Sequence, residues 1–276
     1  MALVAATQSS RLVKISGEDM LQATNLSLAF DNKPILDNIS LDVEAGELLC
    51  ILGPNGAGKS SLLNCLTGDY SGYDGKVMLN FKNIKDFSGL QLSGVRAVMP
   101  QSIYLDFPFL VKEVVQMALR SVSKSNIETV TLQALERFDV MHLAERNFLT
   151  LSGGEKQRVH LSRVLAQLEY SGFHRDEPRY LFLDECTSSL DLSHQHQVFA
   201  KVKEFAQYHR IGVVAVLHDL NLAAQYGDRA LLLKQGKVQA LNKIEKVYQN
   251  RLLSYVYDFP VEIMQHPKGW PLVVSQ

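Results

Sequence analysis

The stretch Gly53-Pro-Asn-Gly-Ala-Gly-Lys-Ser60 decides the fold of this 276-residue chain. It follows the apolar run Leu48-Leu-Cys-Ile-Leu52 and opens the helical stretch Ser61-Leu-Leu-Asn-Cys-Leu66. A strand, a glycine-rich turn and a helix in this order are typical of a phosphate-binding loop, because the glycines let backbone N–H groups turn toward an anion. The helix adds the positive end of its dipole. The pattern therefore predicts a site for a nucleoside triphosphate.

Two side chains of this loop carry specific roles. Lys59 can reach the β- and γ-phosphates, and the Ser60 hydroxyl can ligate Mg²⁺. An ordinary glycine-rich turn could match the pattern by chance, but the flanking strand and helix disfavour that alternative. The predicted nucleotide-binding residues here are Gly53, Pro54, Asn55, Gly56, Ala57, Gly58, Lys59, Ser60 and Ser61.

The composition limits the class of protein. The chain is 46% hydrophobic, has a formal net charge of −1 and a pI of about 6.7. It can build one large core or two closely associated ones, and it lacks the strong positive field that holds nucleic acid. Three cysteines without CxxC spacing indicate buried thiols in a reducing compartment. No apolar run is long enough to span a bilayer, so we expect a cytoplasmic chain that reaches any membrane through a partner.

Alternating strands and helices predict an α/β fold with a mainly parallel sheet. Continuous apolar runs at 180–183 and 213–217 suit central parallel strands, and 230–233 is expected to be the last strand of the core. Period-two alternation between 20 and 43 predicts an antiparallel β region. Apolar residues at helical spacing predict helices over 111–120, 126–146, 192–209 and 244–257.

These elements divide the chain into four expected parts. They are an N-terminal tail (1–17), a P-loop ATPase core (18–101 and 179–243), a helical insertion (102–178), and a C-terminal helix and tail (244–276).

Two acids end the apolar strand that runs up to Leu183. At the carboxyl edge of a parallel sheet, beside the phosphate loop, Asp184 can hold Mg²⁺ through its water shell. Glu185 is then placed to orient and polarise an attacking water. The alternative is a pair of solvated loop carboxylates, which the phosphate loop upstream makes less favoured.

The stretch Leu151-Ser-Gly-Gly-Glu-Lys-Gln-Arg158 predicts a second anion site. Ser152 and Glu155 form a capping box at the head of an apolar-periodic helix. Gly153 and Gly154 leave backbone amides uncovered there, although a plain helix cap would have the same pattern. One nucleotide could use both phosphate-binding helix starts only if two chains meet face to face.

Together these motifs resemble the ATP-binding subunits of ABC transporters over about residues 20–240. The resemblance rests on 53–60, the signature 151–157, Asp184-Glu185, Ser189-Leu-Asp191, Gln101 and His218. It implies an ABC ATPase core that binds ATP and Mg²⁺ and hydrolyses ATP. It also implies that two copies sandwich two ATP molecules, each between one copy's phosphate loop and the other copy's Ser152, Gly153 and Gly154.

The same resemblance assigns roles to single residues. Gln101 would sense and ligate Mg²⁺ and move the helical insertion, His218 would contact the γ-phosphate, and Asp191 would link the two sites. Phe30 falls where the family places an aromatic ring against adenine, with core packing as the alternative. The family usually has Asp-Glu-Pro-Thr where this chain has Asp-Glu-Cys186-Thr. A tolerated small residue is the favoured interpretation of Cys186, and a redox-sensitive thiol the alternative.

Within the family, the chain resembles the ATP-binding subunits of hemin importers. The matching stretches are 96–101, Phe107-Pro-Phe109, Glu113-Val-Val, 178–185, Leu217-His-Asp-Leu-Asn-Leu-Ala-Ala224 and the tail His266-Pro-Lys-Gly269. Iron-siderophore and cobalamin importers are the alternatives. A soluble ABC-type ATPase of DNA repair or translation is more distant, and a non-catalytic cassette is disfavoured by Glu185 and His218. His194 and His196 are expected on a solvated helix face rather than as heme ligands.

The resemblance also implies partners. They are a second copy of the chain, two membrane-spanning permease subunits and, through these, a periplasmic binding protein, with no nucleic acid. The chain would lie peripherally on the cytoplasmic face of the bacterial inner membrane. The apolar stretch Tyr104, Leu105, Phe107, Pro108, Phe109 and Leu110 is the predicted groove for a short permease helix. Packing within the insertion is the alternative for these residues.

Overall fold

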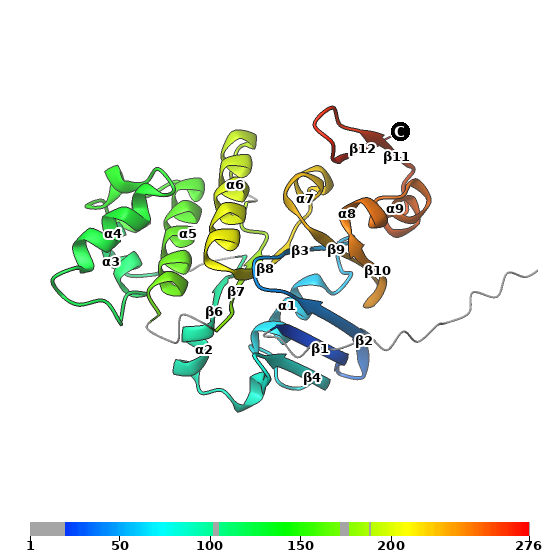
Figure 1. Ribbon diagram of the computed structural model, residues 1–276, viewed down its shortest axis with the longest axis horizontal. Helices are drawn as coiled ribbons and strands as arrows, with labels where there is room; N and C mark the ends of the chain where they lie inside the picture. Colours follow the sequence, from blue (N-terminus) through cyan, green and yellow to red (C-terminus); the bar gives the residue numbers. More distant parts are fainter. Residues whose placement is uncertain (1–19, 102–104, 172–176, 188, 276) are drawn as a thin grey trace, which may run out of the picture.

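A six-stranded sheet organises the chain, in the order β10-β9-β3-β8-β7-β6 (Figure 1). The computed structural model describes residues 20–101, 105–171, 177–187 and 189–275. The strands are β3 (Leu48–Leu52), β6 (Arg96–Met99), β7 (Arg179–Asp184), β8 (Ile211–Val216), β9 (Arg229–Lys234) and β10 (Lys237–Lys243). All neighbours are parallel except β10, which returns antiparallel to β9. Every residue of β3, β7 and β8 is buried, as continuous apolar runs require.

A smaller antiparallel sheet covers one face of the large sheet. Its order is β2-β1-β4-β5, from β1 (Leu21–Phe30), β2 (Lys33–Val43), β4 (Asp74–Leu79) and β5 (Lys82–Asn83). Helix α1 (Lys59–Thr67) lies between the two sheets, and their apolar side chains form one core cluster with it. The prediction of an α/β fold with an antiparallel region is therefore confirmed.

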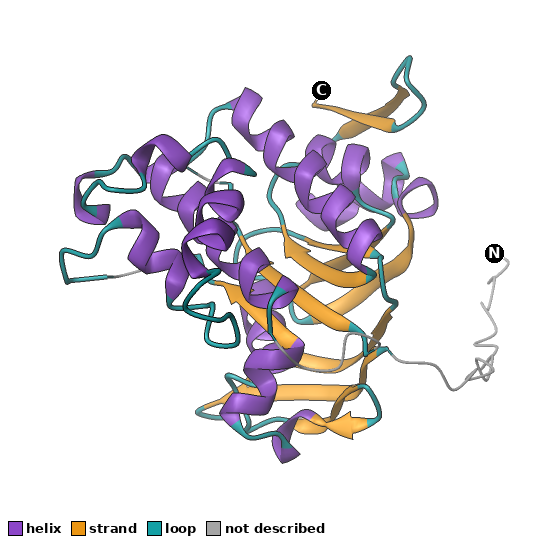
Figure 2. Cartoon of the chain, turned by 60° about the vertical axis from the view of Figure 1, so that its left-hand side comes forward, coloured by secondary structure: helices purple, strands orange, loops and turns teal. Residues whose placement is uncertain are grey.

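The opposite face of the large sheet packs against helices. These are α5 (Gly153–Glu169), α6 (Leu192–His209) and α7 (Leu220–Tyr226), which share a second core cluster with residues from the other side of β3, β7 and β8. Helices α3 (Val111–Gln116) and α4 (Ile127–Glu136) join α5 in a lobe at the left of Figure 1. Helix α2 (Gly89–Val95) lies just before β6. Figure 2 shows the helices of this face beside the sheet strands.

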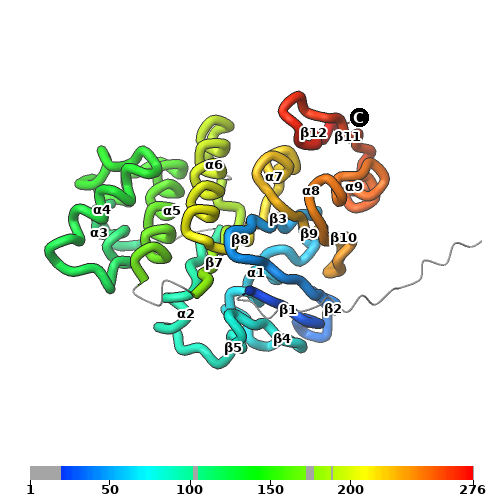
Figure 3. Tube along the Cα trace, viewed as in Figure 1, coloured from blue at the N-terminus to red at the C-terminus, as the bar shows by residue number. Residues whose placement is uncertain are grey.

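The C-terminal part forms its own small unit beside α7. It contains α8 (Ile244–Val247), α9 (Asn250–Tyr257) and a hairpin of β11 (Val261–Gln265) and β12 (Pro271–Ser275). The tube in Figure 3 places this hairpin at the end of the chain, above α7 and α9. The expected helix over 244–257 is broken into α8 and α9. Tyr248 and Gln249 leave the helical conformation, with ψ of 84° and 134°, and so separate α8 from α9.

Other expectations need correction. The strand at 230–233 is not the last strand of the core, because Gln235 and Gly236 both take positive φ and turn the chain back into β10. The insertion helices end earlier than their apolar periodicity predicts, at Gln116 and Glu136. The expected tail (1–17) and Tyr104 lie outside the described residues. Within the described ranges, no helix is long and apolar enough to cross a membrane.

Candidate active site

The phosphate loop has the backbone shape that its glycines predict. Gly53 and Gly58 have φ of 148° and 100°. A Cβ at Gly53 would lie 2.2 Å from the Leu233 carbonyl oxygen, and one at Gly58 would lie 2.9 Å from Leu36 Cδ2. Gly58 precedes α1 without a side-chain cap, so the first amide groups of α1 remain open to an anion.

Lys59 folds back over this loop. Its buried Nζ donates to the carbonyl oxygens of Gly53 at 2.9 Å and Pro54 at 3.1 Å. Burial lowers the pKa of the Lys59 ammonium, while the nearby carboxylates of Glu185 and Asp184 raise it. Among the described residues, no carboxylate forms an ion pair with it. An ammonium has three donors, so one N–H remains for a ligand in the cleft.

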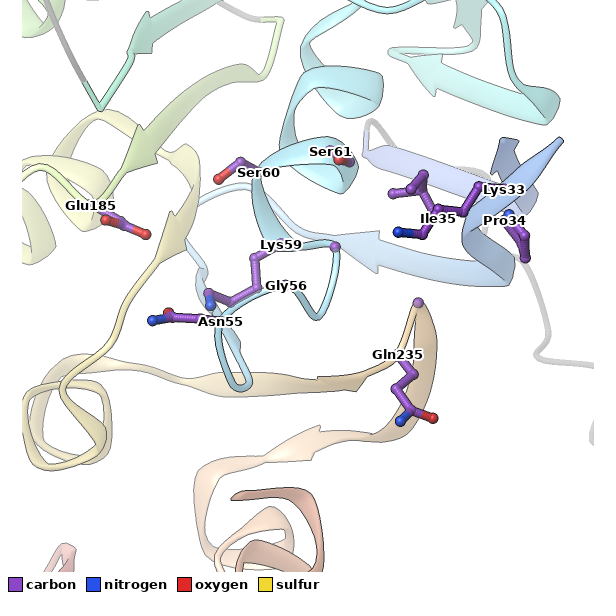
Figure 4. A pocket seen from close by; sticks show the side chains of 12 residues that line it. Lys33, Pro34, Ile35, Asn55, Gly56, Lys59, Ser60, Ser61, Glu185 and Gln235 are labelled. Carbon is purple, nitrogen blue, oxygen red and sulfur yellow. The ribbon is translucent and has the colours of Figure 1, made fainter. Parts of the chain in front are cut away.

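The loop forms one wall of a cleft of about 580 Å³. Figure 4 shows Asn55, Gly56 and Lys59 on this wall, Glu185 to one side, and a second wall from other elements. That second wall comes from the start of β2 and from the turn between β9 and β10. Its residues are Lys33, Pro34, Ile35, Gln235 and Gly236. No pattern in the sequence places these residues beside the phosphate loop.

Phe30 does not line this cleft. Its side chain is 47% exposed, and its ring meets Tyr70 edge-on at 5.5 Å between centroids. The exposure argues against core packing, and the adenine contact stays a prediction.

Ser60 and Asp184 bring two oxygen ligands together. Ser60 Oγ donates to Asp184 Oδ1 at 3.3 Å. Burial raises the pKa of the Asp184 carboxyl, although the hydrogen bond from Ser60 lowers it. A hydroxyl and a carboxylate fit Mg²⁺, which prefers oxygen ligands and usually keeps waters and phosphate oxygens around it. In the described part of the chain, no group of three or more His, Cys, Asp or Glu could hold a metal ion.

Glu185 lies where three parallel strands end. In the sheet, Met99 pairs with Leu183 and Asp184 pairs with Val216, so Gln101, Glu185 and His218 emerge at the same edge. Gln101 Nε2 donates to Glu185 Oε2 at 2.6 Å, and His218 Nε2 forms a hydrogen bond with Glu185 Oε1. The structure thus brings together all three residues that the sequence predicted to be catalytic.

The signature residues lie in a separate depression. Ser152 Oγ accepts a hydrogen bond from the amide of Glu155, whose carboxylate accepts one from the Ser152 amide, so the predicted capping box is present. Gly153 and Gly154 pack closely on the loop at Ser189 and Leu190. The depression, of about 380 Å³, shares none of its described lining residues with the phosphate-loop cleft. One chain therefore does not bring the two predicted phosphate sites together.

Asp191 borders this depression and caps α6. It accepts a hydrogen bond from the His194 amide, and its carboxylate lies 2.9 Å from His194 Nδ1. These hydrogen bonds lower the pKa of Asp191. His196 Nδ1 lies 3.3 Å from the hydroxyl of Tyr226. The expectation of a solvated face is thus only partly right, because both histidines are half-buried and hydrogen-bonded locally.

Cys186 is buried next to Asp184 and Glu185. Burial raises the pKa of its thiol to about 12. Since the thiolate is the reactive form, this environment favours the interpretation of a tolerated small residue over a redox-sensitive thiol.

We expect Asp184→Asn to stabilise the nucleotide-free chain while it weakens Mg²⁺-dependent catalysis by about tenfold or more. A raised carboxyl pKa means that the folded chain binds the proton more readily than the unfolded chain. The free energy of unfolding therefore falls as pH rises and the Asp184 carboxyl loses its proton. The uncharged amide of the Asp184→Asn variant avoids this loss. Each kcal/mol recovered raises Tm by about 2–4 °C in a chain of this size. Calorimetry of the variant and the parent chain at pH 7.5 and pH 3.5 measures the gain in Tm. A gain at pH 3.5 as large as that at pH 7.5 would contradict the prediction.

The chain is similar to known proteins over most of its length. The ABC transporter family model matches residues 36–188. The hemin import ATP-binding protein HmuV of Hydrogenovibrio crunogenus is 47% identical over 92% of this chain and 99% of its own length. HmuV of Pseudomonas fluorescens is 43% identical over 93% of this chain and 100% of its own length.

Solved structures agree with the sequence relatives. An inward-facing metal-chelate type ABC transporter is similar with a TM-score of 0.76 and 25% identity, over 94% of this chain and 98% of that chain. A dimeric ATP-binding cassette with ADP and phosphate bound has a TM-score of 0.69 and 26% identity, over 81% of this chain and 98% of that chain. The chain therefore belongs to the ABC transporter family, as an ATP-binding subunit with that family's ATPase domain.

Proposed function

We propose that this chain hydrolyses ATP to power hemin import, on the cytoplasmic face of a bacterial inner membrane. The observation that carries the proposal is the Glu185 carboxylate, held by Gln101 and His218 at the edge of the cleft that Lys59 and Ser60 line. The hemin import proteins similar to this chain over nearly their whole length support the cargo.

The residues divide the work of hydrolysis. The loop amides, the start of α1 and Lys59 bind the phosphates and fix their orientation. Ser60 and Asp184, with Gln101, would hold Mg²⁺, which neutralises developing phosphate charge when bound. Glu185 accepts a hydrogen bond from the attacking water and orients it toward the γ-phosphate. His218, half exposed beside Glu185, is placed to donate to the γ-phosphate.

The proposed active form has two copies of the chain. The phosphate loop and the signature line separate depressions of one chain, so each ATP would need Ser152, Gly153 and Gly154 from the other copy. Asp191, at the border of the signature depression, would link the two sites. The dimeric cassette among the structural relatives supports this arrangement.

Two permease subunits would carry the cargo, with a periplasmic binding protein delivering it to them. Phe107 and Phe109 are the proposed anchors for the permease, and they differ in burial. Phe107 is 69% exposed, whereas Phe109 packs partly against the helical core and its carbonyl oxygen accepts from the Phe148 amide. Phe107 is therefore the better candidate for direct contact.

The catalytic role predicts the behaviour of Glu185→Gln. The amide cannot act as the base that polarises water, so ATP hydrolysis should fall by about a hundredfold or more while ATP binding persists. The ATP-bound dimer of this variant should then form but dissociate slowly, because its ATP is not hydrolysed. ATP should therefore convert the variant from monomer to dimer in gel filtration. Hydrolysis at the parental rate would refute the role of Glu185.

The docking role predicts that Phe107→Ala weakens permease binding and abolishes substrate uptake, while the ATPase activity of the isolated subunit survives. Phe81→Ala is the control, because Phe81 is 61% exposed but lies in the turn between β4 and β5 of the small sheet. Binding is measured by co-purification with the permease and uptake in proteoliposomes. Normal transport by Phe107→Ala would place the docking surface elsewhere.

The cargo is tested with the transporter reconstituted in proteoliposomes. Binding protein supplied with hemin should stimulate ATP hydrolysis, whereas a ferric siderophore or cobalamin should not. Stimulation by either of these instead of hemin would reassign the cargo and leave the ATPase role intact.

A further inference from the structure

The motif Leu217-His-Asp-Leu-Asn-Leu-Ala-Ala224 holds a residue whose side chain has a partner far along the chain. The amide of Val273 donates to Asn221 Oδ1 at 2.7 Å, and Asn221 Nδ2 donates to the carbonyl oxygen of Val273 at 3.1 Å. Asn221 thus satisfies both backbone groups on the outer edge of β12, as a neighbouring strand would. Strand β12 packs against α7, and Figure 1 shows the hairpin near that helix.

A second contact ties the same turn of α7 to the C-terminal part. The hydroxyl of the buried Tyr248 donates to the Leu220 carbonyl oxygen at 2.7 Å. Asp219 caps α7 from within, because its carboxylate accepts from the amides of Asn221 at 2.8 Å and Leu222 at 3.0 Å. The three residues that follow His218 are therefore held by a cap and by three hydrogen bonds to C-terminal residues.

His218 itself has little support. Its side chain is 46% exposed, and within the described part of the chain it forms one side-chain hydrogen bond, to Glu185. On its N-terminal side, the Leu217 amide donates to the Ile51 carbonyl oxygen of β3. The place of the imidazole therefore depends on a backbone anchored by β3 on one side and by Asn221 and Leu220 on the other.

We infer that Asn221 and Tyr248 are positioning residues for His218, so that the contacts between α7 and the C-terminal part of the chain maintain the rate of ATP hydrolysis. The inference rests on the proposed role of His218 at the γ-phosphate. Neither side chain lines the nucleotide cleft, so both act through the backbone of 218–221. Catalytic groups must keep their geometry closely, and a shift of about 1 Å can cost up to a hundredfold in rate.

The hairpin provides a matched control. Val273 pairs with Ile263 across it, and the Ile263 amide donates to Asn250 Oδ1 at 3.0 Å. Asn221 and Asn250 thus hold opposite outer edges of the hairpin at the same position, but only Asn221 belongs to the helix that follows His218. Alanine favours both helices, so neither substitution weakens its own helix through propensity.

The test measures ATP hydrolysis, nucleotide binding and thermal unfolding for the full chain. Asn221→Ala should lower kcat by about tenfold with KM for ATP unchanged, whereas Asn250→Ala should keep the parental kcat with a similar loss of Tm. Tyr248→Phe, which removes one hydroxyl, should lower kcat in the same way. This variant replaces Asn221→Ala in the test if Asn221→Ala does not fold. Equal kcat for the Asn221 and Asn250 variants would overturn the inference.

A double-mutant cycle separates positioning from general structure. If Asn221 acts through His218, Asn221→Ala should have no further effect on kcat in a His218→Ala chain. Additive losses would overturn the inference. Glu185→Gln, measured in parallel, tests the proposed function by itself. If it abolishes hydrolysis and Asn221→Ala does not change kcat, then only the role of the hairpin fails.

Discussion

The candidate active site depends on two hydrogen bonds to one carboxylate, that of Glu185. Gln101 and His218 make them from the ends of β6 and β8, which flank β7 in the parallel sheet. Neighbouring strands lie about 4.8 Å apart, so the parallel register brings side chains that are distant in sequence within reach of one another. The helical insertion follows Gln101 directly. A ligand that competes with Gln101 and His218 for hydrogen bonds to Glu185 would therefore affect both the insertion and α7.

Two buried charged groups of this site lower the stability of the folded chain when no nucleotide is bound. Lys59 and Asp184 are both buried, and burial shifts the pKa of each toward its neutral form. A buried charge without full pairing destabilises the folded chain. ATP with its phosphates would supply the missing partners, so part of the binding energy would offset this cost. The stability of the subunit and its affinity for nucleotide are thus coupled through these two residues.

The sequence predicted the parts of the site that lie next to strong local patterns. The phosphate loop, Asp184 and Glu185 follow continuous apolar strands, and the capping box of Ser152 marks the start of α5. The patterns were weaker where an element is short or half exposed. Strand β10 has intermediate burial along its middle, and α2 has seven residues, so neither shows a clear period. The second wall of the cleft was missed because it comes from turns whose place depends on how the sheets pack.

In the proposed two-copy arrangement, the signature helix α5 would complete the ATP site of the partner copy. Ser152 Oγ donates to Glu155 Oε2 at 2.8 Å and accepts from the Glu155 amide, so its hydroxyl is engaged within the cap. The amides of Gly153 and Gly154 belong to the first turn of α5, where no partner exists within the helix. A γ-phosphate brought by a second copy would meet these amides and the positive end of a 17-residue helix. Because Glu155 lies on the same turn and is anionic, Ser152 would have to turn from that carboxylate to the phosphate. The cap thus stabilises α5 in the single chain and competes with the contact that would complete the site.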